Sequence, residues 1–393
     1  MCDQKEQVIE LCKALIGAQS YSGAEDQAAS VITEFGKGDE FDEVSVDALG
    51  NVALVINGAL NGPTLMLDGH IDTVPVNKEH WETDPFSPVE KDGRLYGRGS
   101  SDMKGSVSAM IVAAKQFARE TGKNFPGRVI ISCSVHEETF EGVATRSVSN
   151  KFNPDLVVIG EATGLNLNRG QRGRAEVVVE TTGVSVHSAN PEKGVNAALQ
   201  MMKLLAEIEK LPAPEDPFMG KGILVLTDII SSPYPGKSVL PASCRATFDR
   251  RTLVNETKES VLQPIQQVIE QLKKDDPTFR AKVYYSKGTD KCYTGASIEA
   301  ERFFPAWMYD EDADFVEKPL QALREIGIPA QLSHYSFCTN GSHFAGEAGI
   351  PTIGFGPSRE NLAHTDNEYI ELNQLIQAVE GFAAIMRALL IEK

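Results

Sequence analysis

The chain has 393 residues and carries 55 acidic against 38 basic side chains, which gives a formal net charge of −17. This acidic balance argues against nucleic acid and against an anionic membrane as partners, because both attract basic proteins. Hydrophobic residues make up 41% of the chain, and no apolar run approaches membrane-spanning length. We therefore expect a globular protein without a membrane span, long enough for two domains.

The N-terminal stretch and the cysteines bear on the compartment. The stretch MCDQKEQVIELC has neither a basic start nor an apolar segment, so we expect no signal peptide. The cysteines show no CxxC spacing, and we expect each to be a buried small hydrophobe in a reduced, cytoplasmic protein. The six are Cys2, Cys12, Cys133, Cys244, Cys292 and Cys338.

Residues 3–159 alternate between helical and strand-like patterns. Apolar spacing predicts a helix over 3–17, and a capping box at Ser22–Glu25 predicts a second helix that ends near Phe35. A third helix is predicted from about Lys104 to Glu120. Strand-like runs lie at 44–46, 52–56, 64–67, 95–96, 129–134 and 156–159. This alternation predicts a mostly parallel α/β sheet with its chemistry at the carboxyl ends of strands.

The middle of the chain has a different pattern, which predicts an inserted βαββαβ module. Its expected elements are strand 174–181, helix 195–211, strands 222–230 and 243–251, helix 257–274 and strand 280–285. The first domain then resumes, with a helix at 314–326, a strand at 352–355 and a closing helix at 372–390. The predicted boundaries are 1–174 and 289–393 for the first domain and 175–288 for the insertion.

Histidine and acidic side chains follow several predicted strands. In MLDGHIDTVP, His70 and Asp72 are two residues apart at a strand end, so both side chains can point to one face. A metal-bound imidazole usually donates its other N–H to a carboxylate, which this spacing could supply. In GRGSSDMKG, Asp102 lies in a glycine-rich loop that lacks the G-x-G-x-x-G pattern, so a cation suits that loop better than a phosphate.

Adjacent carboxylates occur in SCSVHEETFEG, where Glu137 and Glu138 follow an apolar run. Like charges repel, and burial raises their pKa unless a cation holds them. Glu161 follows another apolar strand in VVIGEATG, and His364 precedes the closing helix in LAHTDNEYIEL. Each could lie in a solvated turn. Their joint position at strand ends of one domain favours a site that contains a positive charge not encoded by the chain.

Taken in order, these motifs resemble the zinc amidohydrolases that include acetylornithine deacetylase, succinyl-diaminopimelate desuccinylase and carboxypeptidase G, the ArgE/DapE/carboxypeptidase G metallopeptidases. The resemblance covers nearly the whole chain. It implies a zinc-peptidase-like α/β fold, in which a mixed sheet has helices on both faces and a ferredoxin-like βαββαβ lid is inserted. The matching stretches are GHIDTVP, W-x-x-D-P-F from Trp81, GRGSSDMKG, HEE, GEATG, GVSVHSANPEKGVNA and AHTDNEY.

The resemblance implies a ligand set for two metal ions. His70, Asp102 and Glu161 would bind one ion, and Asp102 would bridge to a second ion held by Glu138 and His364. Ligands of nitrogen and oxygen without thiolates suit two Zn²⁺ ions per chain, with Co²⁺ or Mn²⁺ possible.

The resemblance also implies roles for the residues around these ligands. Asp72 would orient His70, and Glu137 would act as general base toward a metal-bridged water. A cis peptide bond is expected between Asp102 and Met103.

Three further residues are predicted to contact substrate. His187 resembles the lid histidine that stabilises the oxyanion, often from the other subunit of a dimer, although it could be a surface residue. Arg251 in FDRRTL resembles an arginine that binds a substrate carboxylate, or it forms a salt bridge within the lid while Arg250 faces the other way. Asn340 in CTNGSHFAG is predicted to contact substrate where relatives carry Gly-Gly-Thr-Asp, with Thr339 and Ser342 beside it.

The remaining histidines are expected to be structural or to lie at the surface: His80, His136, His334 and His343. Within the family, the stretch YTGASIEAERFFPAW (Tyr293–Trp307) and the CTNG sequence are most similar to the YgeY-type hydrolases, which are linked to selenium metabolism. The resulting hypothesis is a cytoplasmic amidohydrolase that cleaves an amide bond of a small N-acyl amino acid or dipeptide-like molecule. It would form a homodimer through the lid. A single-metal carboxypeptidase and a non-catalytic binding protein on the same fold remain alternatives.

Overall fold

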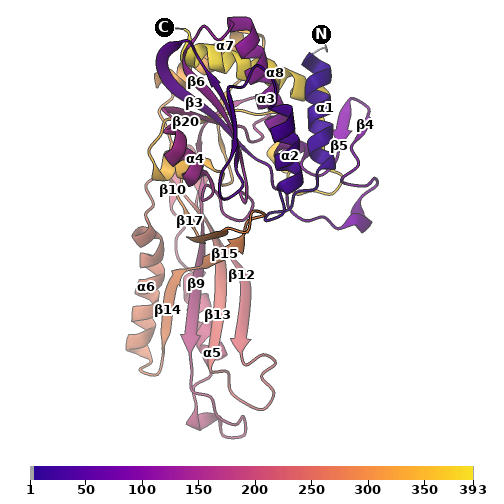
Figure 1. Cartoon of the computed structure of the whole chain (residues 1–393). Coiled ribbons are helices and arrows are strands. Elements are labelled where there is room, and N and C mark those ends of the chain that lie inside the picture. The colour runs from indigo at the N-terminus through magenta and orange to yellow at the C-terminus, as the bar shows by residue number, and fades with distance from the viewer. Residues whose placement is uncertain (1–3, 393) are drawn as a thin grey trace. The chain divides into compact units, whose positions relative to one another are not determined.

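The computed structural model describes residues 4–392, which form two compact units (Figure 1). The first unit comprises the chain up to Gln171, Thr289–Ala300 and the chain from Trp307 onward. The second comprises Arg172–Gly288 and Glu301–Ala306. Residues 301–306 were predicted to belong with the first domain. They pack with the second because strand β17 (Phe303–Phe304) pairs with β9 (Gly173–Thr182).

A nine-stranded mixed sheet forms the centre of the first unit. Its strands lie in the order β1-β2-β6-β3-β7-β20-β8-β18, and β19 pairs with β8 off this path. This is the mixed sheet that the family resemblance implies. The strands are β1 (Glu43–Val46), β2 (Val52–Asn57), β3 (Leu60–His70), β6 (Pro126–Ser134), β7 (Leu156–Ile159), β8 (Leu167–Gln171), β18 (Trp307–Met308), β19 (Leu332–Tyr335) and β20 (Thr352–Gly354).

The prediction of a mostly parallel sheet is wrong at the margins of this sheet. Strands β3, β6, β7 and β20 form its parallel middle. The pairs β1–β2, β2–β6, β8–β20 and β8–β18 are antiparallel. At one margin the antiparallel pair β1–β2 is joined by a short turn rather than by a crossover helix. In the middle, His70 lies opposite Ser134 and Asp68 opposite Ile159, so the carboxyl ends of β3, β6 and β7 meet at one edge.

Helices cover both faces of this sheet, since alternate strand residues point to opposite faces and both sets are apolar. On one face, α4 (Thr145–Phe152) and the short helix η4 (Ser342–Glu347) pack on a cluster that includes Met66 and Ile130. On the other face, Val107 and Met110 of α3 lie against Gly69. Helix α3 (Gly105–Thr121) packs with α1 (Gln4–Gly17) and α8 (Leu372–Leu390), and α7 (Asp314–Glu325) packs on α8 (Figure 1).

The capping box predicted at Ser22–Glu25 is wrong. Helix α2 (Asp26–Phe35) has Glu25 at its N-cap, and no side chain caps it. The Oγ of Ser22 instead donates to Asp72 Oδ2 at 2.7 Å. Glu25 Oε1 accepts from the backbone N–H groups of Gly23 and His136, at 2.8 and 3.3 Å. Tertiary contacts with the sheet edge therefore replace the local cap.

The second unit is a sheet with two helices on one face (Figure 1). Its strand order is β12-β13-β9-β14, and neighbouring strands are antiparallel. One apolar cluster joins both helices to alternate residues of β9 and β13, from Ala175 to Val179 and from Cys244 to Phe248. The elements follow β9 as α5 (Ala197–Ile208), β12 (Ile223–Ser232), β13 (Ser243–Thr252), α6 (Lys258–Asp275) and β14 (Ala281–Tyr285).

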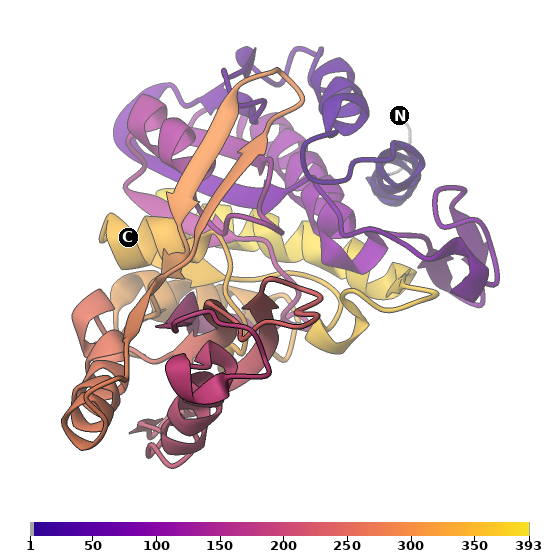
Figure 2. The ribbon, with the colours of Figure 1, turned by 90° about the horizontal axis from the view of Figure 1, so that it is seen from below.

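A hairpin of β15 (Lys287–Lys291) and β16 (Ser297–Glu301) has its turn within the first unit, where it packs near the start of β2, and Figure 2 shows the hairpin in orange. Tyr293 Oη donates to the carbonyl of Gly50 at 3.0 Å, and Thr294 Oγ1 donates to that of Ala48 at 2.7 Å. The remaining elements are the sheet of β4 (Val89–Lys91), β5 (Arg94–Tyr96) and β21 (Tyr369–Glu371), the pair β10 (Glu215–Asp216) and β11 (Gly220–Lys221), and the short helices η1 (Lys78–His80), η2 (Ser100–Lys104), η3 (Pro191–Lys193) and η5 (Glu360–Leu362).

The cysteines and helices bear on the predictions made from composition. Five cysteines lie among residues 4–392, and all five are buried and unpaired, whereas Cys2 lies outside the described residues. Within the same residues, no helix combines the length and the apolar character that a bilayer crossing requires.

Candidate metal centre

His70 ends strand β3 and is almost fully buried. Its Nδ1 lies 2.9 Å from the backbone carbonyl of Asp72, so a proton on Nδ1 leaves Nε2 free to act as a ligand. Nε2 lies 3.0 Å from Asp102 Oδ1 and 3.3 Å from Glu161 Oε1. Glu161 follows β7, the parallel neighbour of β3, which explains why it reaches the same point.

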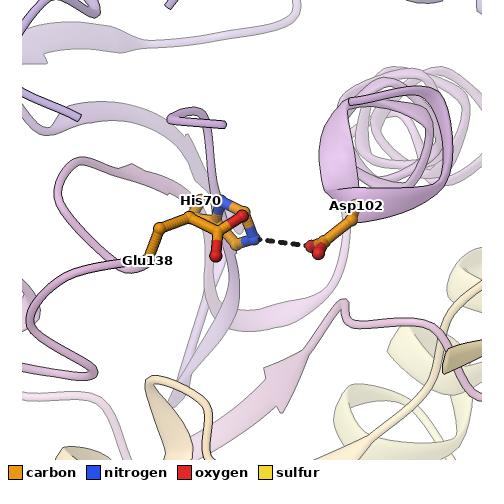
Figure 3. A group of neighbouring side chains, drawn as sticks. All are labelled: His70, Asp102 and Glu138. Carbon is orange, nitrogen blue, oxygen red and sulfur yellow. Dashed lines mark hydrogen bonds and ion pairs between the residues drawn. The ribbon is translucent and has the colours of Figure 1, made fainter. Parts of the chain in front are cut away.

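Asp102 lies in the loop between β5 and α3 and faces two histidines. Its Oδ1 meets His70 Nε2, and its Oδ2 lies 3.2 Å from His364 Nε2. The peptide bond between Asp102 and Met103 is cis, as the family resemblance implies. Figure 3 shows Asp102 and Glu138 pointing toward His70 from a helix entry and from a turn. One carboxylate therefore lies between two imidazoles.

His364 and Glu138 form the second half of the cluster. His364 Nε2 lies 2.9 Å from Glu138 Oε2, and the imidazole side chain is 54% exposed. His70 is only 1% exposed, so the two halves differ in access to solvent. The backbone of His364 has φ +60°, an uncommon conformation for a residue with a side chain.

The turn after β6 explains how adjacent glutamates can face one centre. Asp72 Oδ1 accepts from the backbone N–H of Glu137, and Oδ2 accepts from that of Glu138, both at 3.1 Å. Asp72 Oδ1 also lies 3.5 Å from His70 Nδ1, farther than the 2.9 Å of its own carbonyl. The Asp72 carboxylate therefore holds the turn, a contact that the sequence did not predict, and its backbone carbonyl makes the closer contact with His70.

Crowding and burial change the protonation of the carboxylates. Burial raises the pKa of Glu137 well above its ordinary value, and the charges of Glu161 and Glu138 raise it further against the opposing effect of His70. Burial and the nearby Asp102 charge raise the pKa of Glu138 to about 7, and the same two causes raise the pKa of Glu161. These carboxylates repel one another in the absence of a cation.

The histidines and Asp102 shift toward their charged forms. Burial disfavours the charge on His70, yet Glu161 and Asp102 outweigh burial and raise the His70 pKa well above its ordinary value. Hydrogen bonds to Asp102 and then Glu138 raise the pKa of His364 to about 10. Burial opposes ionisation of Asp102, but the two histidines lower its pKa. The cluster thus favours positive charge at both imidazole positions.

The donor set fits divalent cations. Glu137 Oε1 and Glu138 Oε1 are buried and have no hydrogen-bond partner among the described residues. Two groups of residues each offer ligand atoms that lie within 4.8 Å of one another inside the group. One is His70 with Asp102 and Glu138, and the other is His70 with Glu137 and Glu161. All donors are nitrogen or carboxylate oxygen, the types that bind zinc, cobalt or manganese. A cation would compensate both the crowded charge and the orphaned oxygens.

Two of the predicted substrate contacts belong to the second unit. His187 is exposed, and its Nδ1 accepts from the backbone N–H of Ala189 at 3.1 Å. Arg251 Nε donates to Asp249 Oδ1 at 2.7 Å on the face of the sheet opposite α5 and α6. Arg250 points to the helix-covered face and pairs with Glu256. The two arginines thus face opposite ways.

Asn340 is buried in the first unit, and its amide makes three internal hydrogen bonds. Its Nδ2 donates to Asp68 Oδ1 at 2.8 Å and lies 2.7 Å from Ser134 Oγ, and its Oδ1 accepts from the N–H of Gly142 at 2.8 Å. An aspartate at this position would set a second buried carboxylate against Asp68, which gives a physical reason for asparagine here. A contact between Asn340 and substrate stays a prediction.

The histidines that were not assigned to the site have other partners. His136 lies 3.2 Å from Thr139 Oγ1 and from the carbonyl of Lys291. His80 lies 3.3 Å from Asp366, and His343 lies 2.9 Å from Glu347.

Sequence reasoning missed four residues that support the centre. Ser22, Glu25 and Asp68 contribute hydrogen bonds described above, and Glu368 binds the loop that carries Asp102. Two carried a signal. Asp68 is two residues before His70 on the same strand face, and Glu368 lies in the AHTDNEY motif itself. Ser22 and Glu25 carried none, because their role depends on contacts distant in sequence.

Comparison with known proteins gives the family. Residues 66–388 match peptidase family M20/M25/M40. This chain belongs to that family. It is 33% identical to protein YgeY of Escherichia coli strain K12 over 352 residues, which cover 88% of this chain and 85% of that protein. It is therefore a metal-dependent hydrolase.

Two further similarities extend the comparison. The chain is 33% identical over 257 residues to succinyl-diaminopimelate desuccinylase 2 of a Ruegeria species, which covers 62% of this chain and 64% of the relative. The crystal structure of aminopeptidase PepT from Bacillus cereus superimposes with a TM-score of 0.75 at 21% identity, and covers 98% of both chains. This last similarity shows the fold.

Proposed function

We propose that this hydrolase cleaves an amide bond in a small N-acyl amino acid or dipeptide-like substrate, with two divalent ions per chain. One observation carries the proposal. The two carboxylate oxygens of Asp102 each face a different histidine, and each histidine has a second acidic partner. His70 with Glu161 forms one donor set, and His364 with Glu138 forms the other.

Asp102 would be shared between the two ions, which we expect to be Zn²⁺, with Co²⁺ or Mn²⁺ as possible substitutes. When bound, two such ions supply Lewis acidity toward the amide carbonyl and lower the pKa of a water molecule between them. The chain's own task is to hold the donors in place, and the Asp72 contacts with the Glu137–Glu138 turn support this.

Glu137 is the residue best suited to move the proton. Its Oε2 lies 4.0 Å from His70 Nε2, so it borders the donor set, and its Oε1 has no partner among the described residues. Burial raises its pKa, which favours its ability to accept a proton and hold it for the leaving nitrogen. General acid–base catalysis of this kind contributes about 10²–10⁴-fold.

Substrate recognition would involve the second unit. The N–H of Ala189 keeps Nδ1 of His187 an acceptor, so Nε2 carries a proton and can donate to a developing oxyanion. Arg251 could bind a substrate carboxylate with its guanidinium, since Asp249 orients it without burying it. The desuccinylase relative, whose name denotes an N-acylated substrate, supports this class.

We also propose that the protein is a homodimer formed through the second unit. Strand β12 is an edge strand, and Ile223, Val225, Leu226, Ile229 and Ile230 on it are each at least 40% exposed. An exposed apolar edge strand is a template for pairing with a second chain. Light scattering at micromolar concentration should give a dimer, and Ile229→Lys should shift it toward monomer. A monomeric wild type would contradict the proposal.

The cellular location is a smaller part of the proposal. Five described cysteines are unpaired and buried, which suits a reducing, cytoplasmic compartment.

The function is tested by a hydrolysis screen on metal-reconstituted protein with acetyl, succinyl and carbamoyl amino acids and dipeptides. At least one class should be turned over, and Glu137→Gln should lose turnover while it keeps the metal content of the wild type. A variant with full activity would exclude Glu137 as the base. Metal-loaded protein that hydrolyses none of these amides would favour a non-catalytic binding protein on the same fold.

A further inference from the structure

Glu368 is fully buried and binds the loop that carries Asp102. Its Oε1 accepts from the backbone N–H groups of Ser101 and Asp102, at 2.7 and 3.0 Å. Its Oε2 accepts from the backbone N–H of Gly99 at 3.0 Å and from Arg98 Nη1 at 2.7 Å. One carboxylate thus satisfies three backbone donors of a single loop, and one of these donors belongs to the residue that faces both histidines.

The loop is shaped to receive a carboxylate. Gly99 has φ +85°, and a side chain there would approach Lys104 and Thr73 within 3 Å. Successive N–H groups that turn inward around such a left-handed residue form an anion-binding concavity. The other end of the loop is also fixed, because the buried Lys104 donates to the carbonyls of Leu15 and Ala18 at the end of α1, both at 2.8 Å.

Strand pairing brings Glu368 to this concavity. Strand β21 pairs with β5 in antiparallel register, with Tyr369 opposite Tyr96. The N–H of Gly97 then donates to the carbonyl of Glu368 at 3.0 Å, which continues the pairing by one step. The segment that supplies Glu368 also supplies His364, four residues earlier. A ligand candidate of one donor set and the support of the shared ligand candidate therefore lie on the same short segment.

We propose that Glu368 is a positioning residue that fixes the Asp102 carboxylate between His70 and His364 and so keeps both donor sets loaded. The inference rests on the function proposed above. Without the carboxylate, the N–H groups of Ser101 and Asp102 would lose their acceptor, and the loop could rotate the Asp102 side chain away from one histidine. Residues that orient metal ligands in this way typically change metal affinity by about 10–100-fold when replaced.

The test compares Glu368→Gln with a matched variant, Asp47→Asn. Asp47 Oδ1 accepts from the backbone N–H groups of Leu49, Gly50 and Asn51, at 2.9, 2.9 and 3.0 Å, in a loop without candidate ligands. Both substitutions remove a carboxylate that holds three backbone donors. The readouts are Co²⁺ titration of the metal-free protein, the visible absorption of the Co²⁺ form, the thermal midpoint, and kcat and KM separately.

For Glu368→Gln we expect Co²⁺ affinity to fall about 10–100-fold, with an altered Co²⁺ spectrum and a lower kcat at little-changed KM. For Asp47→Asn we expect a lower thermal midpoint with wild-type affinity and spectrum. Glu368→Asp keeps the charge on a shorter arm and should give an intermediate affinity. It carries the same readouts if Glu368→Gln does not fold.

Two negative results would have different meanings. Wild-type Co²⁺ affinity and spectrum in both Glu368 variants, with only the midpoint lowered, would overturn the inference and leave a purely structural residue. A wild-type protein that binds no Co²⁺ would instead contradict the proposed two-metal function, whatever the variants do.

Discussion

The charged side chains of the candidate metal centre in the first unit and those on the sheet of the second unit are compensated in different ways. In the second unit, Arg250 and Glu256 form a buried pair at 2.6 Å, and the more exposed Arg251 and Arg174 share Asp249. Each of these charges has a local partner of opposite sign. In the first unit, buried acidic groups outnumber the imidazoles that they face. These groups are His70, Asp102, Glu137, Glu138, Glu161 and His364.

The difference shows what separates a structural charge from a functional one. A paired charge is stabilised by a partner within the folded chain, so it stays ionised without a bound ion. A cluster with more buried acidic groups than imidazoles is tolerated only if it changes protonation or binds a cation. Glu137 and Glu138, with pKa values raised by burial, are of the second kind. A glutamate-to-glutamine substitution should therefore have opposite effects on stability in the candidate metal centre and in a pair such as Arg250–Glu256.

The largest effect is expected for Glu138→Gln in the first unit. It removes the second acidic partner of His364, so one metal ion should be lost, and most of the activity with the Lewis acidity that this ion supplies. The Glu138 pKa is raised to about 7, so its charge destabilises the metal-free fold as the pH rises through 7. The metal-free variant should accordingly unfold at a higher temperature than metal-free wild type at pH 8. Metal analysis that still finds the wild-type content would favour the single-metal carboxypeptidase alternative.

Glu256→Gln in the second unit should destabilise the protein by about 3 kcal/mol, because it leaves the guanidinium of Arg250 buried without its counter-ion. Glu256 also accepts from the backbone N–H of Leu253 at 2.7 Å. Urea unfolding would measure the loss, and metal content should not change. The double variant Arg250→Met with Glu256→Gln should recover part of the stability. A single variant as stable as wild type would mean that the pair is not compensating a buried charge.

The next effect concerns Glu25, another buried first-unit carboxylate with no cationic side chain among its hydrogen-bond partners in residues 4–392. Burial first, and then the charge of Asp72, raises the pKa of Glu25 to about 7. A raised folded-state pKa gives stability that is present below the ordinary value and lost as the pH rises through 7. Between pH 5 and pH 8, the free energy of unfolding of the wild type should fall by on the order of 2 kcal/mol because of Glu25, and Glu25→Gln should not show this fall. Urea unfolding with chelator present measures both.

A control for this pH effect comes from Glu347, which pairs with His343 and Arg146. Burial opposes its ionisation, but these partners lower its pKa to about 2. Its contribution is present above the ordinary carboxyl pKa and is lost only as the pH falls toward 2. Glu347→Gln should therefore leave the pH 5 to pH 8 slope unchanged. An equal slope in wild type and Glu25→Gln would show that Glu25 does not titrate in that window.

Much of the fold and of the candidate site could be predicted from local patterns. Apolar periodicity predicted α1, helices were also predicted where α3 and α8 lie, and the acidic residues that follow apolar strands predicted which side chains converge. This works because parallel strands bring their carboxyl ends to one edge, so a strand-end residue meets others from distant parts of the sequence. His70 and Glu161 meet for that reason.

The contacts that fix the loops could not be predicted in the same way. Asp72 accepts from two N–H groups 65 and 66 residues away, and Glu368 accepts from that of Asp102 266 residues away. Neither contact produces a periodic pattern in the sequence, because each depends on a single side chain and on how two loops are aligned. Ser22 and Glu25 matched a capping pattern, but their side chains bond to Asp72 and to the backbone N–H of His136 at the sheet edge instead of capping the helix.

The smallest effect is expected for Arg251, whose side chain is 29% exposed. This arginine has a structural partner in Asp249 and is also predicted to contact substrate. Exposed pairs such as Arg251–Asp249 contribute about 0–1 kcal/mol, so Arg251→Gln should change the free energy of unfolding little. If its guanidinium also binds a substrate carboxylate, KM should rise about 10-fold with kcat nearly unchanged, because a charge-assisted hydrogen bond is lost in ground state and transition state alike. Arg174→Gln is the matched control, since Arg174 Nε donates to the same Asp249 at 2.9 Å. Equal KM values in both variants would assign Arg251 to the structural pairs of the second unit. A rise in KM confined to Arg251→Gln would instead indicate that the Arg251 guanidinium binds the substrate carboxylate.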